Sequence, residues 1–229
     1  MKKKFFLTIQ TTYHATIISL SHDSSLISML SIDNKQASKI LIASIDTLLT
    51  EQHSTLHDVE CIGVYQGPAP FTTLRTALAT VNGLAYVQGI PLVGVDGLKA
   101  FVQEYKEQSD RYVLVLLNAF CNDVYFAWYD KTTNYLQTGC KNAHEYMKEL
   151  ATVYSDGDVI AVGNAISLYT NELQTVFGPH LVIPEPTPQV VSHEVVIQQA
   201  LQEYRAQHIH KQLMPLYLKQ HSAQIVLNQ

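Results

Sequence analysis

The chain has 229 residues, of which 47% are hydrophobic and 15% charged, and its formal net charge is −5. This length and apolar content suit one or two compact domains with a substantial core. The negative net charge argues against a protein that binds nucleic acid by itself, so any nucleic-acid role is expected to be shared with a partner. Three scattered cysteines without a CxxC spacing argue against a disulfide scaffold and a zinc site.

The N-terminus carries three lysines, and the apolar run after Lys4 is interrupted at Thr8 and stops at Gln10. This run is shorter than the about 7–15 residues of a secretory signal, so we interpret it as a first strand. No stretch reaches the about 18 apolar residues that cross a membrane. We therefore expect a cytoplasmic protein with reduced cysteines and no membrane attachment.

The first half of the chain alternates short β-branched runs with helical patterns. Strands are expected at residues 5–9, 16–20, 25–30, 61–65 and 92–95, and helices at residues 36–51, from about 71 to 88, and at 97–106. The order of three strands, helix, strand, helix, strand, helix is typical of an α/β unit with an antiparallel region leading into a parallel part.

The second half predicts a similar order. Strands are expected at residues 112–118, 123–129, 135–138, 159–162 and 181–183, and helices at residues 143–154, 166–176 and 190–204. Two similar α/β lobes with mixed sheets are the architecture of the actin-like ATPase (ASKHA, RNase H-like) fold. We place an N-terminal lobe at residues 1–107 and a C-terminal lobe at 108–229, with a C-terminal tail able to pack back on the first lobe.

The middle of the first half is almost uncharged, because Arg75 is the only charged side chain between Glu60 and Asp96. A chain that folds in water buries so long an uncharged run, against itself or against a partner. The helix within this run has one bulky stripe and one small-residue face, so it can be packed on two sides. As the only charge, Arg75 is expected to make a buried or interfacial pairing.

The segment from Gly67 to Thr73 has two interpretations. Its backbone N–H groups lead into a helix N-terminus and could cradle a phosphate, which makes Gly67 and Thr72 candidate nucleotide-facing residues. However, no GK[ST] follows, and two prolines remove donors, so a structural turn is favoured. Gly163 lies between a short strand and a helix, a junction that can also face a nucleotide in this fold class.

The uncharged run resembles the signature of the TsaB family, which has the form GPGSFTGLR, a small-residue helix, GLA and then IPLVGV. The matching residues are Gly67-Pro68-Ala69-Pro70-Phe71-Thr72-Thr73-Leu74-Arg75, Gly83-Leu84-Ala85 and Ile90-Pro91-Leu92-Val93-Gly94-Val95. Residues 7–12 resemble the opening LAIDTS of the family, and residues 214–219 resemble its closing P-x-YLR. The resemblance covers nearly the whole chain.

This resemblance implies a non-catalytic dimerisation subunit of the machinery that places a threonylcarbamoyl group on N6 of adenosine 37 in tRNA. Such a subunit is a homodimer when alone, binds a TsaD-like catalytic subunit through the first-lobe helices, is joined by a TsaE-like ATPase, and meets tRNA only through the complex. The expected partner interface comprises Phe71, Leu74, Arg75, Leu78, Ala79, Asn82, Ile42 and Ile45. No catalytic residue, intrinsic cofactor or metal ligand is expected, and ATP or ADP with Mg²⁺ is expected only at the interface with the catalytic partner.

Departures from the family pattern bear on the chemistry. The opening aspartate, which lies near the metal and phosphates in actin-like ATPases, corresponds to Gln10, a candidate nucleotide-facing residue but a poorer ligand for a hard cation. Pro70 and Thr73 stiffen the signature loop. An active nucleotide hydrolase or kinase of this fold is the alternative hypothesis, and a protease, suggested only by an old family label, is a third.

Overall fold

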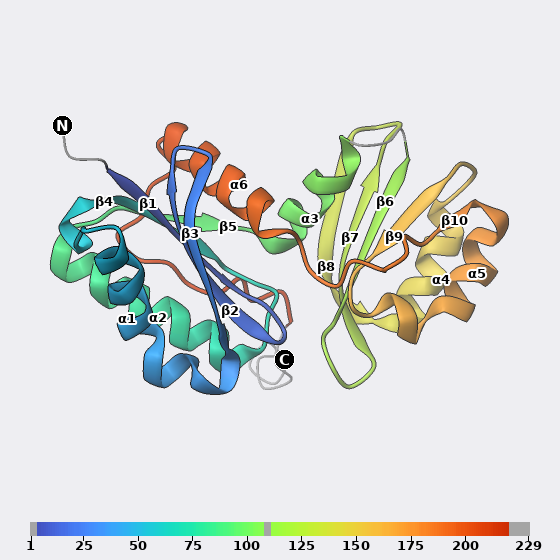
Figure 1. The fold of residues 1–229 in the computed structure, drawn as a ribbon. Coiled ribbons are helices and arrows are strands. Elements are labelled where there is room, and N and C mark those ends of the chain that lie inside the picture. The colour runs from blue at the N-terminus through green and yellow to red at the C-terminus, as the bar shows by residue number, and fades with distance from the viewer. Residues whose placement is uncertain (1–3, 108–110, 220–229) are drawn as a thin grey trace, which may run out of the picture. The chain divides into compact units, whose positions relative to one another are not determined.

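The computed structural model describes residues 4–107 and 111–219 (Figure 1). The chain forms two compact units, each with one five-stranded mixed sheet. Unit 1 comprises residues 4–97 and 192–216, and unit 2 comprises residues 98–107, 111–191 and 217–219. The two mixed sheets with flanking helices confirm the expected fold class. The lobe boundary that we placed after residue 107 stays a prediction.

The sheet of unit 1 has the strand order β3-β2-β1-β4-β5. The first three strands form an antiparallel meander, and the last two continue parallel to β1. The strands are β1 (Phe5–Thr11), β2 (Ala15–His22), β3 (Ser25–Asp33), β4 (Val59–Tyr65) and β5 (Leu92–Val95), with a short 3-10 turn at Leu56–Asp58. The helices α1 (Asn34–Glu51) and α2 (Phe71–Gln88) pack against each other on one face, and α6 (His193–Arg205) covers β1, β4 and β5 on the other (Figure 1).

Strand β4 is apolar because helices cover both of its faces. Ile62 and Val64 belong to the core beneath α1 and α2. Gly63 faces α6, where an added Cβ would lie 2.6 Å from the Cβ of Ala200 and 3.0 Å from the ring of Phe6. Close packing of α6 on the sheet therefore requires glycine at position 63.

Unit 2 has the strand order β10-β9-β6-β7-β8. Its strands are β6 (Tyr112–Asn118), β7 (Asp123–Asp130), β8 (Tyr135–Asn142), β9 (Val159–Val162) and β10 (Leu181–Val182). Its helices are α4 (Ala143–Val153) and α5 (Thr170–Phe177), with 3-10 turns at Ile166–Leu168 and Gly178–His180, and α3 (Gly97–Lys106) leads into it. Aromatic rings fill the core, including stacked pairs Phe126–Tyr146 and Tyr112–Trp128 with centroids 3.9 and 5.3 Å apart.

The two sheets repeat one topology, as the order of predicted elements indicated. In each, an antiparallel meander of three strands is followed by two strands added in parallel to the first. Element ends differ from the predictions by a few residues: β8 extends to Asn142, α5 begins at Thr170 after a 3-10 turn, and α6 begins at His193. Within residues 4–107 and 111–219, no helix combines the length and apolar character needed to cross a membrane.

The packing of α6 gives a stability prediction. We expect Gly63→Ala to lower the free energy of unfolding by about 1–3 kcal/mol, because the new methyl group forces Ala200 and Phe6 to move. Gly83→Ala in α2 is the matched control, since its added Cβ would meet nothing within 4 Å and should stabilise the helix by up to about 1 kcal/mol. Urea unfolding curves measure both changes, and equal midpoints for the two variants would contradict this description of α6.

Candidate functional site

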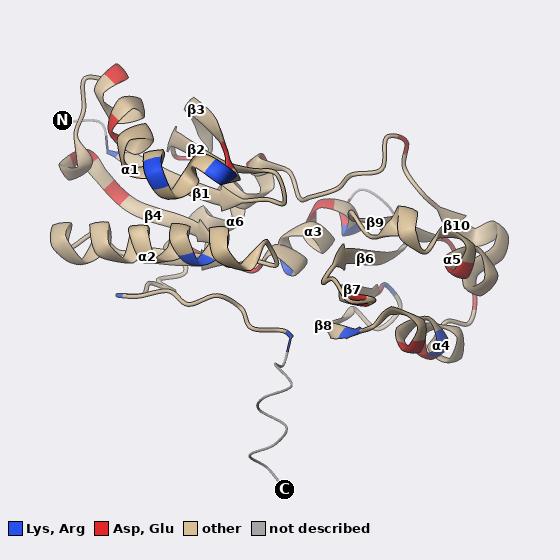
Figure 2. Cartoon of the chain, turned by 90° about the horizontal axis from the view of Figure 1, so that it is seen from below, with Lys and Arg blue, Asp and Glu red and all other residues tan. Residues whose placement is uncertain are grey.

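The outer surface of the α1–α2 pair, which we call the α1–α2 face, combines apolar and charged side chains. Ile42 is 60% exposed and Phe71 is 47% exposed, although both are large hydrophobic residues. Arg75 is the only charge on α2, as the cartoon coloured by charge shows (Figure 2). The exposed members of this face are Lys35, Lys39, Ile42, Asp46, Phe71, Arg75, Ala79 and Tyr86.

Seven of the eight residues expected at the partner interface divide into two groups, and Asn82 is half-buried. Phe71, Arg75, Ala79 and Ile42 are exposed on the α1–α2 face. Leu74, Leu78 and Ile45 are instead buried in the hydrophobic core of unit 1. Core packing accounts for these three side chains, and a partner contact for the four exposed residues stays a prediction.

Asn82 holds the C-terminal segment against α2. Its Nδ2 donates to the carbonyl oxygen of Leu213, and its Oδ1 accepts from the backbone N–H of Leu213, both at 2.9 Å. This pair of hydrogen bonds uses both ends of the amide. Asn82 therefore has a structural role within unit 1, whatever contacts a partner adds.

Arg75 lies over the ring of Phe71, one helical turn earlier, with its Cζ 3.7 Å from the ring centroid. This cation–π contact covers the ring with a polar group that remains in water. The two side chains thus form one exposed unit at the start of α2. The pairing of Arg75 with a partner stays a prediction.

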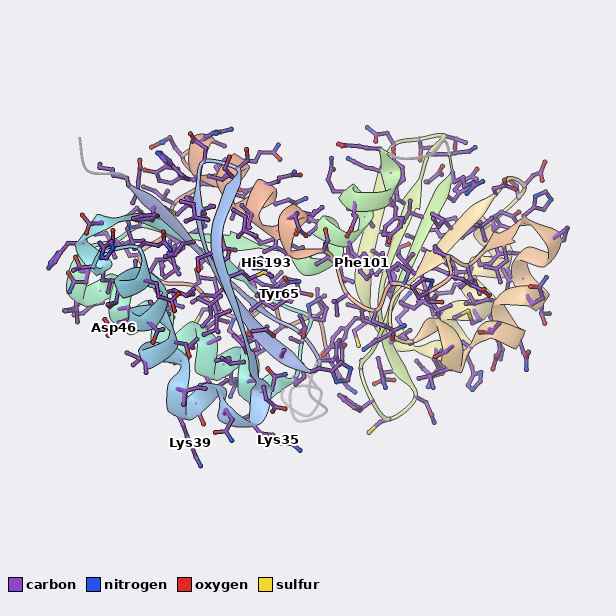
Figure 3. The ribbon with its side chains drawn as sticks, viewed as in Figure 1. Lys35, Lys39, Asp46, Tyr65, Phe101 and His193 are labelled. Atoms are coloured by element: carbon purple, nitrogen blue, oxygen red, sulfur yellow. The ribbon has the colours of Figure 1, made fainter. Side chains whose placement is uncertain are left out.

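The charges of α1 oppose its helix dipole. Lys35 and Lys39 lie in the first two turns, whereas Asp46 and Glu51 lie in the second half, and Figure 3 shows the two lysines projecting from one end of the helix. The N-terminal end of a helix is partially positive and its C-terminal end partially negative, so this distribution destabilises an isolated helix. The start of α1 nevertheless carries a favourable charge, because the carboxylate of the N-cap residue Asp33 accepts a hydrogen bond from the backbone N–H of Lys35 at 2.7 Å.

The loop before α2 is fastened within unit 1. The hydroxyl of Tyr65 donates to the carbonyl oxygen of Pro68 at 3.0 Å, and the backbone N–H of Gly97 donates to the carbonyl oxygen of Gly67 at 2.9 Å. Gly67 and Pro68 are buried, whereas Thr72 is exposed in the first turn of α2. These contacts favour the structural turn over a phosphate cradle, and nucleotide contact by Gly67 or Thr72 stays a prediction.

Gln10 belongs to a buried polar network. Its Oε1 lies 2.8 Å from Nδ1 of His193, and Nε2 of the same imidazole lies 2.7 Å from Oγ of Ser19. A neutral imidazole satisfies both contacts if Nδ1–H donates to Gln10 and Nε2 accepts from the serine hydroxyl. Burial lowers the pKa of His193 to about 4, with nearby Glu194 partly offsetting the effect. The network ties the start of α6 to β1 and β2.

Gly163 forms a close turn in unit 2. Its φ is +115°, and an added Cβ would lie 2.1 Å from the carbonyl oxygen of Leu116. Its backbone N–H donates to the carbonyl oxygen of Pro188 at 2.8 Å. The glycine is therefore required for the backbone conformation, and its proposed contact with a nucleotide stays a prediction.

A family model described as TsaD, tRNA N6-adenosine threonylcarbamoyltransferase, matches residues 31–227, which is most of the chain. The tRNA threonylcarbamoyladenosine biosynthesis protein TsaB of Escherichia coli K12 is 24% identical over 166 residues, covering 69% of this chain and 70% of that protein. The chain belongs to this family, as a divergent TsaB/YeaZ member. A tRNA N6-adenosine threonylcarbamoyltransferase of Clostridium botulinum is 29% identical over 84 residues, but that match covers only 35% of this chain and 25% of the enzyme.

Solved structures agree on the fold. YeaZ from Pseudomonas aeruginosa superposes with a TM-score of 0.71 at 20% identity, covering 94% of this chain and all of that one. A putative N-acetylmannosamine kinase from Listeria monocytogenes gives a TM-score of 0.51 at 10% identity, covering 89% and 99% of the two chains. The TsaB/YeaZ member described here thus has the actin-like ATPase fold that its sequence resemblance implies.

Sequence reasoning missed the partners of Gln10 and the features at the end of α2. His193 is 183 residues from Gln10 and 174 residues from Ser19 in the sequence, so no local pattern links the imidazole to its two partners. The exposed surface at the end of α2 could have been suspected from Tyr86 and Val87. These two large residues are neighbours in the helix, so a helix with one buried stripe cannot bury both of them deeply. The charges of α1 could have been found by comparing their positions with the helix dipole.

The buried imidazole gives a pH prediction. The pKa of His193 is lower in the folded than in the unfolded protein, so as the pH falls below about 6.5 only the unfolded state takes up the proton. This residue's contribution to the free energy of unfolding is complete above pH 7 and should fall by about 2 kcal/mol by pH 5. Urea unfolding at a series of pH values measures the slope. His193→Gln should flatten it, whereas the exposed His57→Gln should not; an unchanged slope in His193→Gln would contradict the network.

Proposed function

We propose that this chain is a non-catalytic, partner-binding subunit in the biosynthesis of threonylcarbamoyladenosine in tRNA, and that it supports a TsaD-like catalytic subunit. Family membership supports the pathway. The observation that carries the scaffold role is the α1–α2 face, where large apolar residues are exposed on a helix with a single charge. Large apolar side chains exposed beside an arginine are typical of a protein interface.

The polarity of α1 supports binding through the same face. A partner with acidic groups opposite Lys35 and Lys39, and a basic group opposite Asp46, would pair with these three charges of the face. A second copy turned end for end carries the opposite order of charges. The same face therefore suits both the proposed homodimer of the isolated chain and its exchange for a TsaD-like subunit.

Catalysis by this chain alone is the weaker candidate. The position that carries aspartate in the family is Gln10, whose amide oxygen faces His193 inside unit 1. A neutral amide engaged in the core is a poor ligand for Mg²⁺. Gln10 therefore does not fit the role of a magnesium ligand, so we assign ATP or ADP with Mg²⁺ to the interface with the catalytic partner. A TsaE-like ATPase and tRNA would join through that complex, in the cytoplasm.

Co-expression with the TsaD-like protein of the same organism tests the proposal. We expect the two chains to co-purify as a complex, and the complex with its ATPase to modify tRNA while this chain alone does not. Size measurement and a threonylcarbamoylation assay are the readouts. ATP turnover by the isolated chain with magnesium would favour the hydrolase or kinase alternative, and a chain that neither pairs with itself nor binds the TsaD-like protein would refute the scaffold role.

Substitutions on the α1–α2 face give a second test. Ile42→Glu and Ala79→Glu place a charge on exposed positions, so each should weaken partner binding by at least about tenfold with no loss of folding. Affinity is measured by titration calorimetry and folding by circular dichroism.

Two control variants separate binding from folding. Val153→Glu makes the same kind of change at a 64% exposed position of α4 and should bind normally. Leu78→Glu places a charge in the core and should unfold the protein rather than act on the interface alone. Normal binding by both Ile42→Glu and Ala79→Glu would exclude this face.

A further inference from the structure

A pocket of about 400 Å³ lies in unit 1 at the C-terminal end of α2, and we call it the α2 pocket. One wall is formed by the last turn of α2 and the turn Gly89–Pro91, and the other by Ile209–Lys211. Pockets of about 300–1,000 Å³ accommodate whole ligands, so this one has room for a large side chain. None of the interface residues expected from the sequence lines it.

Both walls of the α2 pocket are fixed. The backbones of Leu92 and His210 exchange two hydrogen bonds, at 2.8 and 3.1 Å, which attach the second wall to the edge of the sheet. Three residues later, the two bonds between Asn82 and Leu213 attach the same segment to α2. A pocket whose walls are held in this way needs little ordering when it binds.

The chemistry of the lining selects an occupant. Apolar groups dominate the interior, including Ala85, Ile90 and Ile209. His210 and Lys211 contribute the polar groups, and no acidic residue lines the pocket among residues 4–107 and 111–219. An occupant that matches this lining has a large apolar group with a carboxylate beside it, which can pair with the lysine.

The α2 pocket is continuous with the α1–α2 face. Tyr86, one of its lining residues, follows Ala79 by seven residues and Arg75 by eleven, which is close to two and three helical turns. All three side chains therefore lie on the same side of α2. A protein bound along that face reaches the mouth of the pocket without a change of direction.

We propose that the α2 pocket receives an anchor from the protein bound on the α1–α2 face. The anchor is a large apolar or aromatic side chain adjacent to an aspartate or glutamate. This inference rests on the proposed function, in which the bound protein is the TsaD-like catalytic subunit. A protein segment suits the pocket better than a small molecule, because Tyr86 is 87% exposed and leaves one side open, whereas small ligands are usually about 70–90% buried.

The anchor would be an interface hot spot, since an aromatic side chain in a preformed pocket is a typical one. Tyr86→Ala removes a wall of the pocket, and Lys211→Glu reverses the charge at its mouth. Each should raise the dissociation constant for the TsaD-like subunit at least about tenfold. The effect of Lys211→Glu should shrink with increasing salt, because it is electrostatic.

Matched controls make the experiment specific. Val87→Ala truncates the neighbouring side chain, which is 77% exposed and does not line the pocket, and Lys148→Glu reverses an exposed charge on α4. Both should bind within about twofold of the wild type. Titration calorimetry with the purified TsaD-like subunit gives the constants, and unfolding midpoints show that the variants are folded.

The outcomes separate this inference from the proposed function. If the wild-type chain does not bind the TsaD-like subunit, the proposed function itself is refuted. Binding that is lost in Ile42→Glu but normal in both Tyr86→Ala and Lys211→Glu would keep the proposed function and overturn the anchor. An effect of the pocket variants on self-association alone would also overturn it, since the occupant would then be a second copy of this chain.

Discussion

The burial of β4 on both faces is the constraint from which the rest of unit 1 follows. Ile62 and Val64 pack beneath α1 and α2, while Gly63 allows α6 to approach the opposite face. The buried residues 61–65 of this strand carry no charge, whereas Glu60 near its start is exposed, and the inner sides of the covering helices are apolar as well. The outer surfaces of the helices are not under this constraint, and on α2 the charge that this surface carries is Arg75.

The second face of that sheet is covered by a helix from the far end of the chain. Unit 1 is completed only when α6 docks, and the contact includes the imidazole of His193 between Gln10 and Ser19. These three polar groups form hydrogen bonds with one another in the core. The network therefore fixes the orientation of α6 on the sheet as well as adding stability, because only one arrangement pairs all three groups. In this divergent TsaB/YeaZ member, the position of the family aspartate thus contributes to the fold.

Most of the fold could be predicted, because local periodicity reports which elements form and their order limits how they connect. The alternation in β7 and the stripe of α1 gave the right elements within a few residues at their ends. The candidate site was harder. Leu74 and Leu78, which the family resemblance places at the interface, belong to the bulky stripe of α2 and lie in the core, because a stripe indicates which side of a helix is covered, and not by what. The α2 pocket joins residues 85–91 to residues 209–211, and only the folded chain shows that contact.

The repeated topology offers an internal comparison between the helix pairs that follow the two meanders. In unit 2, α4 and α5 each have a glutamate in the first turn, Glu145 and Glu172, where the helix dipole favours it. In unit 1, α1 has the carboxylate of Asp33 at its N-cap, which accepts from the backbone N–H of Lys35. Helix α2 differs from the other three, because it has no acidic residue in its first turn and its N-cap, Pro70, makes no side-chain hydrogen bond. The helices α1, α4 and α5 thus each begin with a carboxylate that suits the helix dipole, whereas the charge that α2 carries is Arg75, beside the exposed ring of Phe71.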